Sequence, residues 1–193
     1  WYLKTQAIRL KKEELNFCAT IESILTISES DRKTILKYTS TPTTTIGLHI
    51  DKYSKNEQDT TIKIDFFHLG AMDWQPNQLG LNWIMNEVFP VVKQKEKSAE
   101  IHLAGRGMPK SFMHQKQKGF FNHGLVSNAI DFMQQHKVMI VPLFSGSGIR
   151  VKIIQGMAIG KCIISTSIGA KGILCTNDKN ILIADTKNEF IDA

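Results

Sequence analysis

Two glycines and two basic residues lie close together between Gly146 and Lys152 and are the clearest candidates for chemistry in the sequence. Glycine has no Cβ, so Gly146 and Gly148 allow the backbone to approach a ligand and to adopt conformations closed to other residues. Arg150 and Lys152 follow at the expected start of a helix, where unpaired N–H groups and the helix dipole attract anions. Two cations at this place are unfavourable without a ligand, so the spacing predicts a phosphate or diphosphate site.

Two familiar phosphate-binding motifs do not account for this segment. The letters GSGIRV match the first two glycines of a dinucleotide-binding fingerprint, but Val151 stands at the position of the third. The letters GMAIGKC resemble a P-loop, but they are one residue short, end in Cys162 and follow a helix instead of preceding one. An exposed basic helix start without a ligand stays open as the alternative interpretation.

Strand and helix patterns alternate around the candidate loop. Apolar runs predict strands at 62–69, 100–104, 120–123, 138–143, 162–165 and 181–184. A long helix is expected after Asp73 as its cap, with Pro76 in the first turn and a kink at Pro90. Further helices are expected at 127–135 and 149–159. This alternation predicts an α/β fold with a Rossmann-like, doubly wound parallel sheet.

The N-terminal part of the chain carries a different pattern. A charged helix over 1–18, a strand at 24–27 and a helix that begins near Ser28 are expected there. The stretch 52–60 has almost no apolar residues and is interpreted as an interdomain linker. The chain begins without methionine and ends at Ala193 in an expected helix start, which favours a piece of a longer polypeptide.

Composition and charge restrict the class of protein. The chain has 193 residues, 42% of them hydrophobic, which suits one globular domain or a fragment of a two-domain protein. A net charge of +6 and a pI near 9.2 favour anionic ligands or surfaces, but the basic residues are scattered, which argues against nucleic acid binding. Three distant cysteines predict free thiols in a reducing compartment. Without a signal peptide or a membrane-length apolar run, the sequence predicts a cytoplasmic protein.

Five of the six histidines are interpreted as isolated. His123 is expected to be a hydrogen-bonded residue at a strand end. The remaining histidines are assigned no function: His49, His68, His102, His114 and His136. No group of His, Asp and Glu has metal-ligand spacing along the chain, so no metal site is predicted.

Several longer segments resemble one enzyme family. LFSGSGIRVKIIQGMAIGKCIISTSIGAKGI resembles the donor-binding segment of retaining GT-B glycosyltransferases of the group-one type. HLGAMDWQPNQLGLNWIMNEVFPVV and EIHLAGRGMP resemble the first two strands of the same domain with the segments that follow them. ESILTISESD and TTTIGLHIDKY resemble the junction that leaves the acceptor domain. The resemblance covers nearly the whole chain in the correct order.

The resemblance implies a fold and a division into domains. Residues 61–193 would be the truncated C-terminal, nucleotide-sugar-binding half of a GT-B fold. Residues 1–51 would be a remnant of the N-terminal acceptor domain, joined by the linker 52–60. The complete enzyme would transfer a sugar from a nucleoside diphosphate with retention of configuration. The missing half would bind an acceptor glycan or lipid-linked glycan in polysaccharide biosynthesis, at the inner face of the membrane or in the cytoplasm. This piece alone is expected to catalyse little.

The resemblance also implies roles for single residues. Arg150 and Lys152 would be catalytic, because their charges stabilise the departing diphosphate and make a metal ion unnecessary. No cofactor is implied beyond the donor substrate. The donor would further be bound at Gly70, Ala71, Arg106, Val126, Gly146, Ser147, Gly148, Ile149 and Gln155.

The family pattern often has two glutamates that flank this helix start, the second of which bonds both ribose hydroxyls, and this sequence departs from it with Ser147 and Gln155. A neutral amide forms weaker hydrogen bonds than a carboxylate, so weaker donor binding is expected. Two alternatives stay open: a nucleotide-sugar epimerase of GT-B fold and a non-catalytic nucleotide-binding module. The sequence does not specify the sugar, the base or the acceptor.

Overall fold

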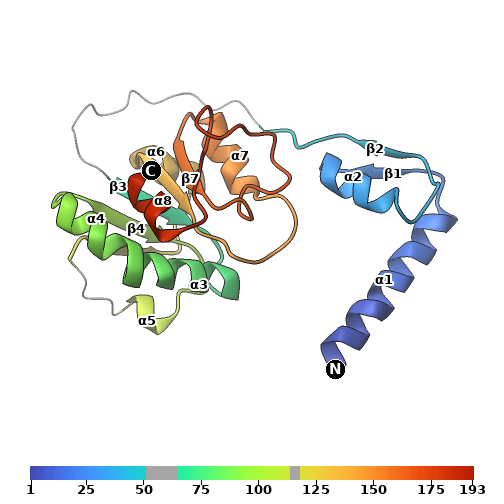
Figure 1. Cartoon of the computed structure of the whole chain (residues 1–193), viewed down its shortest axis with the longest axis horizontal. Coiled ribbons are helices and arrows are strands. Elements are labelled where there is room, and N and C mark those ends of the chain that lie inside the picture. The colour runs from blue at the N-terminus through green and yellow to red at the C-terminus, as the bar shows by residue number, and fades with distance from the viewer. Residues whose placement is uncertain (51–64, 114–117) are drawn as a thin grey trace. The chain divides into compact units, whose positions relative to one another are not determined.

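The structure, a computed structural model, describes residues 1–50, 65–113 and 118–193. It consists of two compact units, Trp1–His49 and Ile50–Ala193, each described here by itself (Figure 1). The predicted linker 52–60 lies outside the described residues, so the proposed domain boundaries stay predictions.

The first unit is small and contains a parallel two-stranded sheet. Its elements are α1 (Tyr2–Thr20), β1 (Ile24–Thr26), α2 (Glu29–Ile35) and β2 (Thr43–Thr45). Ser28 caps α2 as predicted, since its hydroxyl accepts a hydrogen bond from the Asp31 N–H at 3.0 Å. No residue of α1 is buried. None of the helices in the described residues is long and apolar enough to cross a membrane.

The second unit is built on a six-stranded, entirely parallel sheet. Its strands are β3 (Asp65–Leu69), β4 (Glu100–Ala104), β5 (Phe120–Gly124), β6 (Val138–Val141), β7 (Cys162–Ser165) and β8 (Leu182–Ile183). They lie in the order β5-β4-β3-β6-β7-β8. The chain thus moves outward in one direction from β3 and in the other from β6, which confirms the predicted Rossmann-like, doubly wound fold.

Helices cover both faces of this sheet (Figure 1). They are α3 (Gln75–Trp83), η1 (Ile84–Val88), α4 (Phe89–Lys95), α5 (Lys110–Met113), α6 (Ala129–Gln135), α7 (Val151–Ala158) and α8 (Lys187–Asp192). One core contains Leu81, Phe89 and Ile101, and thus joins α3 and α4 to one face of the sheet. The other contains Phe67, Met133 and Ile153, and joins α6 and α7 to the opposite face. Two buried cores, one on each face, explain the near-continuous apolar character of the strands.

Three predicted helix starts are displaced. Asp73 does not cap α3: Trp74 occupies that position without a side-chain bond, because the Met72 N–H is bonded to the Arg106 carbonyl and holds the turn beside β4. The second predicted start moves from Ser127 to Ala129, because Asn128 caps α6. The third helix, α7, begins at Val151, with Arg150 as its N-cap.

The predicted kink at Pro90 takes the form of a widened turn. The helix continues from α3 through the π-helical turn η1 into α4, and the Phe89 N–H bonds to the Ile84 carbonyl five residues earlier. Proline has no N–H and its ring crowds the preceding turn, so a wider turn relieves the clash.

Candidate functional site

The candidate loop lies where the strand order reverses. β3 and β6 are neighbours in the centre of the sheet, yet their following connections run to opposite sides. In open α/β sheets this reversal leaves a crevice at the carboxyl ends of the two strands. The segment after Leu69 and the loop after Val141 therefore belong to one edge, at which ligands of such folds bind.

The loop from Ser145 to Gly148 is exposed and depends on its glycines. Gly146 and Gly148 have φ angles of 123° and 80°, a region that favours glycine. A Cβ at Gly146 would lie 2.7 Å from Arg150 Nη2 and 2.9 Å from the Trp74 ring. Glycine at this position therefore lets Arg150 and Trp74 approach the loop backbone.

Arg150 is held in the loop with part of its hydrogen-bonding capacity unused. Its Nη1 donates to the carbonyls of Ser147 and Gly148, each at 2.6 Å, and its guanidinium lies 5.4 Å from the centre of the Trp74 ring. Nε and Nη2 are buried without a partner. Burial lowers the pKa of Arg150, but a guanidinium remains charged at neutral pH. The side chain is thus positioned and lacks an acceptor.

Lys152 and Gln155 extend the site along the first turns of α7. Lys152 is half-buried, has no ion pair within the described part of the chain, and burial lowers the pKa of its amine. Gln155 Oε1 is buried and makes no hydrogen bond. Ile149, directly before the cap, is partly buried. The described residues therefore provide neither an anion for Lys152 nor a donor for Gln155 Oε1.

The turn after β3 brings Gly70 against two polar side chains. A Cβ at Gly70 would lie 2.8 Å from both Asn77 Nδ2 and His68 Nε2. Asn77 Nδ2 donates to the Ala71 carbonyl at 2.9 Å, which fixes this turn. His68 Nδ1 lies 2.9 Å from the Ile140 carbonyl and must be the donor, so Nε2 is an acceptor that is buried without a partner. Burial lowers the pKa of His68, which keeps the ring neutral.

Unpaired polar atoms are concentrated at this edge of the sheet. Among the described residues, five buried side-chain atoms have no hydrogen-bond partner, and four of them belong to His68, Arg150 and Gln155. Buried polar groups in folded proteins are nearly always paired, so such a concentration points to a polar ligand. The four atoms comprise two donors, Nε and Nη2 of Arg150, and two acceptors, His68 Nε2 and Gln155 Oε1.

Arg106 and Val126 lie on loops at the same edge of the sheet. The loop after β4 packs closely on Gly70, because a Cβ at Gly105 would be 1.7 Å from the Gly70 carbonyl oxygen. Arg106 is exposed, with its Nε 3.5 Å from the Asp73 carboxylate. Val126 follows β5, two strands from β3, and packs partly against the core. The structure thus brings Arg106 close to the Gly70 turn and leaves Val126 further along the edge.

Sequence reasoning missed His68 and Trp74 as members of this edge. His68 lies in an apolar strand and its spacing gave no signal. Trp74 occupies the cap position that the sequence predicted for Asp73, and its residue type did not indicate a contact with the loop.

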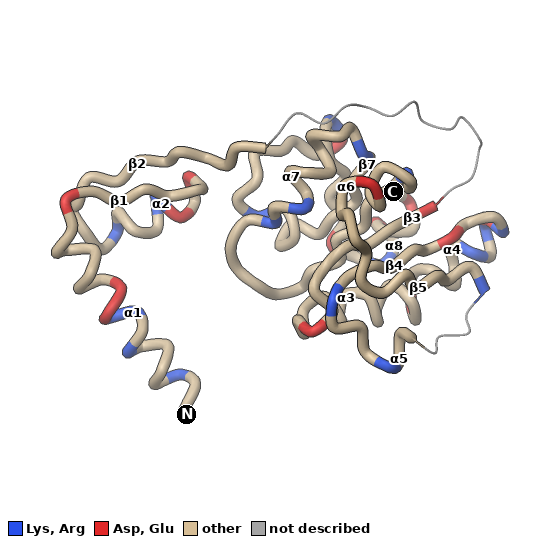
Figure 2. The backbone as a smooth tube through the Cα atoms, turned by 180° about the vertical axis from the view of Figure 1, so that it is seen from behind, with Lys and Arg blue, Asp and Glu red and all other residues tan. Residues whose placement is uncertain are grey.

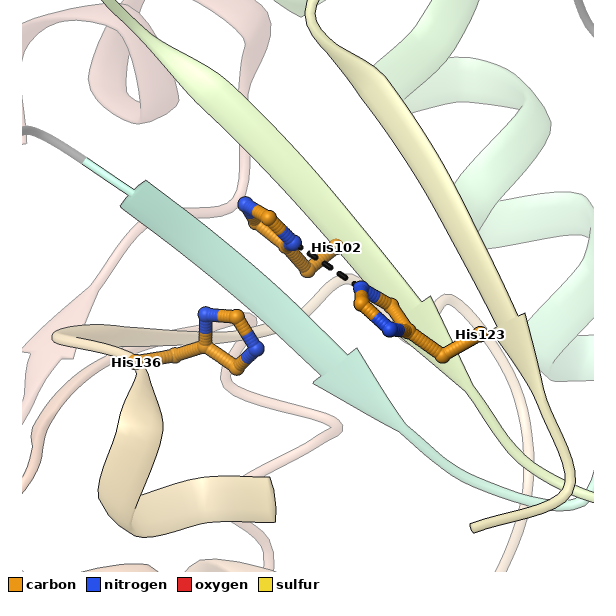
Figure 3. A group of neighbouring side chains, drawn as sticks. All are labelled: His102, His123 and His136. Atoms are coloured by element: carbon orange, nitrogen blue, oxygen red, sulfur yellow. Dashed lines mark hydrogen bonds between the residues drawn. The ribbon is translucent and has the colours of Figure 1, made fainter.

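The interpretation of His102 and His136 as isolated is wrong. His102, His123 and His136 lie together, with one potential ligand atom from each within 4.8 Å of the others (Figure 3). Three different elements supply them, so no sequence spacing indicates the group. The basic residues, in contrast, are spread over several elements, including α1, α4 and α7, as expected (Figure 2). All three cysteines are free thiols.

This chain matches a model of a protein family and is similar to a curated bacterial protein. The family model described as "Glycosyl transferases group 1" matches residues 63–193. An uncharacterized 44.6 kDa protein in the cps region of Klebsiella pneumoniae is 21% identical over 98% of this chain and 50% of its own length. The chain thus spans about half the length of this curated relative.

Solved structures share the fold at low sequence identity. TarM is 16% identical with a TM-score of 0.74, over 94% of this chain and 37% of its own. HepE from Anabaena, solved with UDP and glucose, is 11% identical with a TM-score of 0.65, over 89% of this chain and 52% of its own. These similarities show that the α/β fold with its parallel six-stranded sheet is shared with GT-B glycosyltransferases.

Proposed function

The chain belongs to the group 1 glycosyl transferases, and we propose that its second unit binds the nucleoside-diphosphate sugar from which a longer enzyme transfers the sugar to an acceptor. One observation carries the proposal: a guanidinium with unpaired nitrogens lies beside a glycine loop at the carboxyl edge of β3 and β6. The site has unsatisfied donors, a second cation and little bulk, which are the properties that a diphosphate requires.

In this proposal Arg150 and Lys152 stabilise the charge that develops on the departing diphosphate. Arg150 offers two unpaired nitrogens, Nε and Nη2, to the phosphate oxygens, while Nη1 keeps the loop in place. Lys152 adds a point charge from the first turn of α7. Both groups are partly desolvated, which strengthens their interaction with an anion. Transfer with retention of configuration is part of the same proposal.

The nucleoside is proposed to extend from the diphosphate along α7. Gln155 Oε1, unpaired and buried, is placed to accept a hydrogen bond from a ribose hydroxyl. The TarM variant from S. aureus was solved with UDP, as HepE was, so UDP is the first nucleotide to test here. The acceptor, a glycan or lipid-linked glycan, is proposed to bind a further domain of the longer enzyme, at the inner face of the membrane.

Calorimetric titration with UDP and GDP tests the donor site. The unmutated chain should bind one of them saturably, and Arg150→Ala with Lys152→Ala should weaken this affinity about 10- to 100-fold, because hydrogen bonds to charged groups are lost. A variant with Arg9→Ala and Lys179→Ala removes the same charges at exposed positions and is the matched control. Equal affinity of the two variants, or no binding by the unmutated chain, would contradict the proposal.

A further inference from the structure

Three histidines gather on the face of the sheet that α6 covers. His102 lies in β4, His123 lies in β5 and His136 directly follows α6 (Figure 3). Their ring centres are 4.2 to 5.9 Å apart. His136 precedes the amino end of β6, whereas the proposed diphosphate loop follows its carboxyl end. His136 therefore lies at the opposite edge of the sheet from that loop, while His123 lies near the carboxyl end of β5.

We propose that His102, His123 and His136 bind a divalent transition-metal ion, with Zn²⁺ as the fitting ion. The distance from His102 Nδ1 to His123 Nε2 is 3.0 Å, and one ligand atom of each residue lies within 4.8 Å of the other two. Tetrahedral zinc with Zn–N bonds of about 2.0–2.1 Å sets the ligand nitrogens roughly 3.3 Å apart.

His136 supplies the strongest evidence, because one of its nitrogens is oriented and the other is unused. Its Nδ1 lies 2.8 Å from an oxygen of Asp65, and the second oxygen of this carboxylate accepts the Lys137 N–H at 2.8 Å. An ionised carboxylate accepts only, so Nδ1 carries the proton and Nε2 presents a lone pair. This Nε2 is buried without a partner, on a side chain only 8% exposed. Carboxylates bonded in this way orient metal-binding histidines.

His102 also has a carboxylate beside one of its ring nitrogens, at a longer distance than His136. Its Nε2 lies 3.3 Å from a carboxylate oxygen of Glu100, which leaves Nδ1 facing the cluster. In the structure Nδ1 accepts the hydrogen bond of His123 Nε2. Metal binding would replace that shared proton, which would leave with solvent or move to His123 Nδ1. Two of the three ligands therefore already have an outer carboxylate partner.

The surroundings favour neutral imidazoles and a metal with nitrogen ligands. Phe121 stacks on His102 with ring centres 4.9 Å apart, and Phe132 lies 4.6 Å from His136. The ring packed on His102 shields it from water and so favours the neutral imidazole, which is the form that binds a metal ion. Three imidazoles suit Zn²⁺ and Co²⁺ better than Mg²⁺ or Ca²⁺, which prefer oxygen.

The bound ion would cross-link two strands of the sheet to the turn that follows α6. β4 and β5 already pair along their backbones, and the ion would join both to the turn between α6 and β6, which contacts them there through tilted and edge-on rings. His123 is exposed, which gives the ion access and leaves room for water as the fourth ligand. This cross-link would also restrain the loop after β5, which contains Val126.

Metal titration of the chelator-treated chain tests this site. Equilibrium dialysis should show one Zn²⁺ per chain, and the Co²⁺ form should have the intense visible absorption of four-coordinate cobalt without a thiolate charge-transfer band. His123→Gln, at an exposed position, should weaken binding about 100-fold or abolish it, since a ligand is lost. Saturating Zn²⁺ should raise the melting temperature of the unmutated chain by about 5–10 °C.

Two matched variants separate this site from other metal ligands. His49→Gln removes a histidine in the first unit and should leave binding unchanged. Cys162→Ser removes the exposed thiol and should also leave it unchanged. His136→Gln, checked for folding by circular dichroism, should lose binding as His123→Gln does. The proposal is overturned by the absence of stoichiometric binding, by full binding in His123→Gln, or by loss of binding in Cys162→Ser.

Discussion

At the scale of single residues, the proposed donor site is characterised by side-chain atoms that have no hydrogen-bond partner. Arg150 uses Nη1 to hold the loop carbonyls and leaves Nε and Nη2 without acceptors. Gly146 makes this possible, because any side chain there would displace the guanidinium or Trp74. The chemistry of the loop therefore depends on a residue that contributes no functional group.

Replacement of Gly146 by alanine should reduce the affinity for UDP and, to a smaller extent in free energy, the stability of the folded chain. The new Cβ would lie 2.7 Å from Arg150 Nη2, and the φ of 123° is unfavourable for alanine, at a cost of about 1–3 kcal/mol. We expect a loss of affinity of about 10-fold or more as Arg150 is displaced. Calorimetry and thermal unfolding measure the two effects separately.

Gly47→Ala is the control for backbone strain alone. Its φ is 69°, and a Cβ there would have no atom within 4 Å. UDP affinity should be unchanged in this variant. Equal losses of affinity in the two variants would show that the contact with Arg150 is not the cause.

At the scale of elements, close approach of backbones positions the loop that carries the site. α3 packs on the end of β6 through Gly80, where a Cβ would lie 1.7 Å from the Pro142 carbonyl oxygen. The loop after β4 approaches the loop after β3 in the same way, through Gly105 and Gly70. These contacts fix the edge of the sheet from two sides.

Gly80→Ala should destabilise the second unit, although alanine normally stabilises a helix. Alanine in place of glycine gains about 0.5–1 kcal/mol from helix propensity. The clash with the Pro142 carbonyl involves backbone that cannot rotate away, so we expect a net loss of about 2–4 kcal/mol in the free energy of unfolding. Urea denaturation measures this value.

Gly156, a glycine inside helix α7, is the matched control for Gly80. A Cβ at Gly156 would meet only the ends of the flexible Met139 and Ile163 side chains, at 3.2 and 3.3 Å. Gly156→Ala should therefore change stability by less than about 1 kcal/mol. A larger loss in this variant than in Gly80→Ala would contradict the packing described for α3.

At the scale of the whole molecule, the second unit buries titratable rings as well as apolar side chains. Burial lowers the pKa of His68, and the pKa of His102 falls to about 4. A histidine with a lowered pKa in the folded state takes up protons more readily when the chain unfolds. Stability from this source is complete above the unfolded pKa, about 6.5, and is lost as the pH falls below it.

His68→Gln should reduce the dependence of stability on pH. Each histidine kept neutral by folding lowers the free energy of unfolding by about 1.4 kcal/mol per pH unit below pH 6.5. Removal of His68 should therefore make stability depend less steeply on pH below about 6.5. Urea midpoints across this range measure the slope, and an unchanged slope would mean that His68 is protonated in the folded state.

Much of the fold and part of the site follow from local pattern. Apolar runs and glycine-rich turns located the six strands of the second unit, and their alternation with helices indicated parallel order, because parallel strands need crossover connections. The glycines and cations between Gly146 and Lys152 were visible because they are adjacent in the chain. Helix starts were less accurate: the Asp73 carboxylate lies 3.5 Å from Arg106 Nε of the loop after β4, and Trp74 occupies the cap position of α3.

The sequence by itself determined the layers of the second unit, its glycine loop and its nearby cations, because these depend on periodicity and on neighbours within a few residues. Only the tertiary structure decided that Trp74 lies against Arg150, that His68 lies beneath Gly70, and that three histidines meet. Those contacts depend on the register of parallel strands and on the turn after α6. Packing over the whole sheet sets both, and no spacing along the chain reveals them.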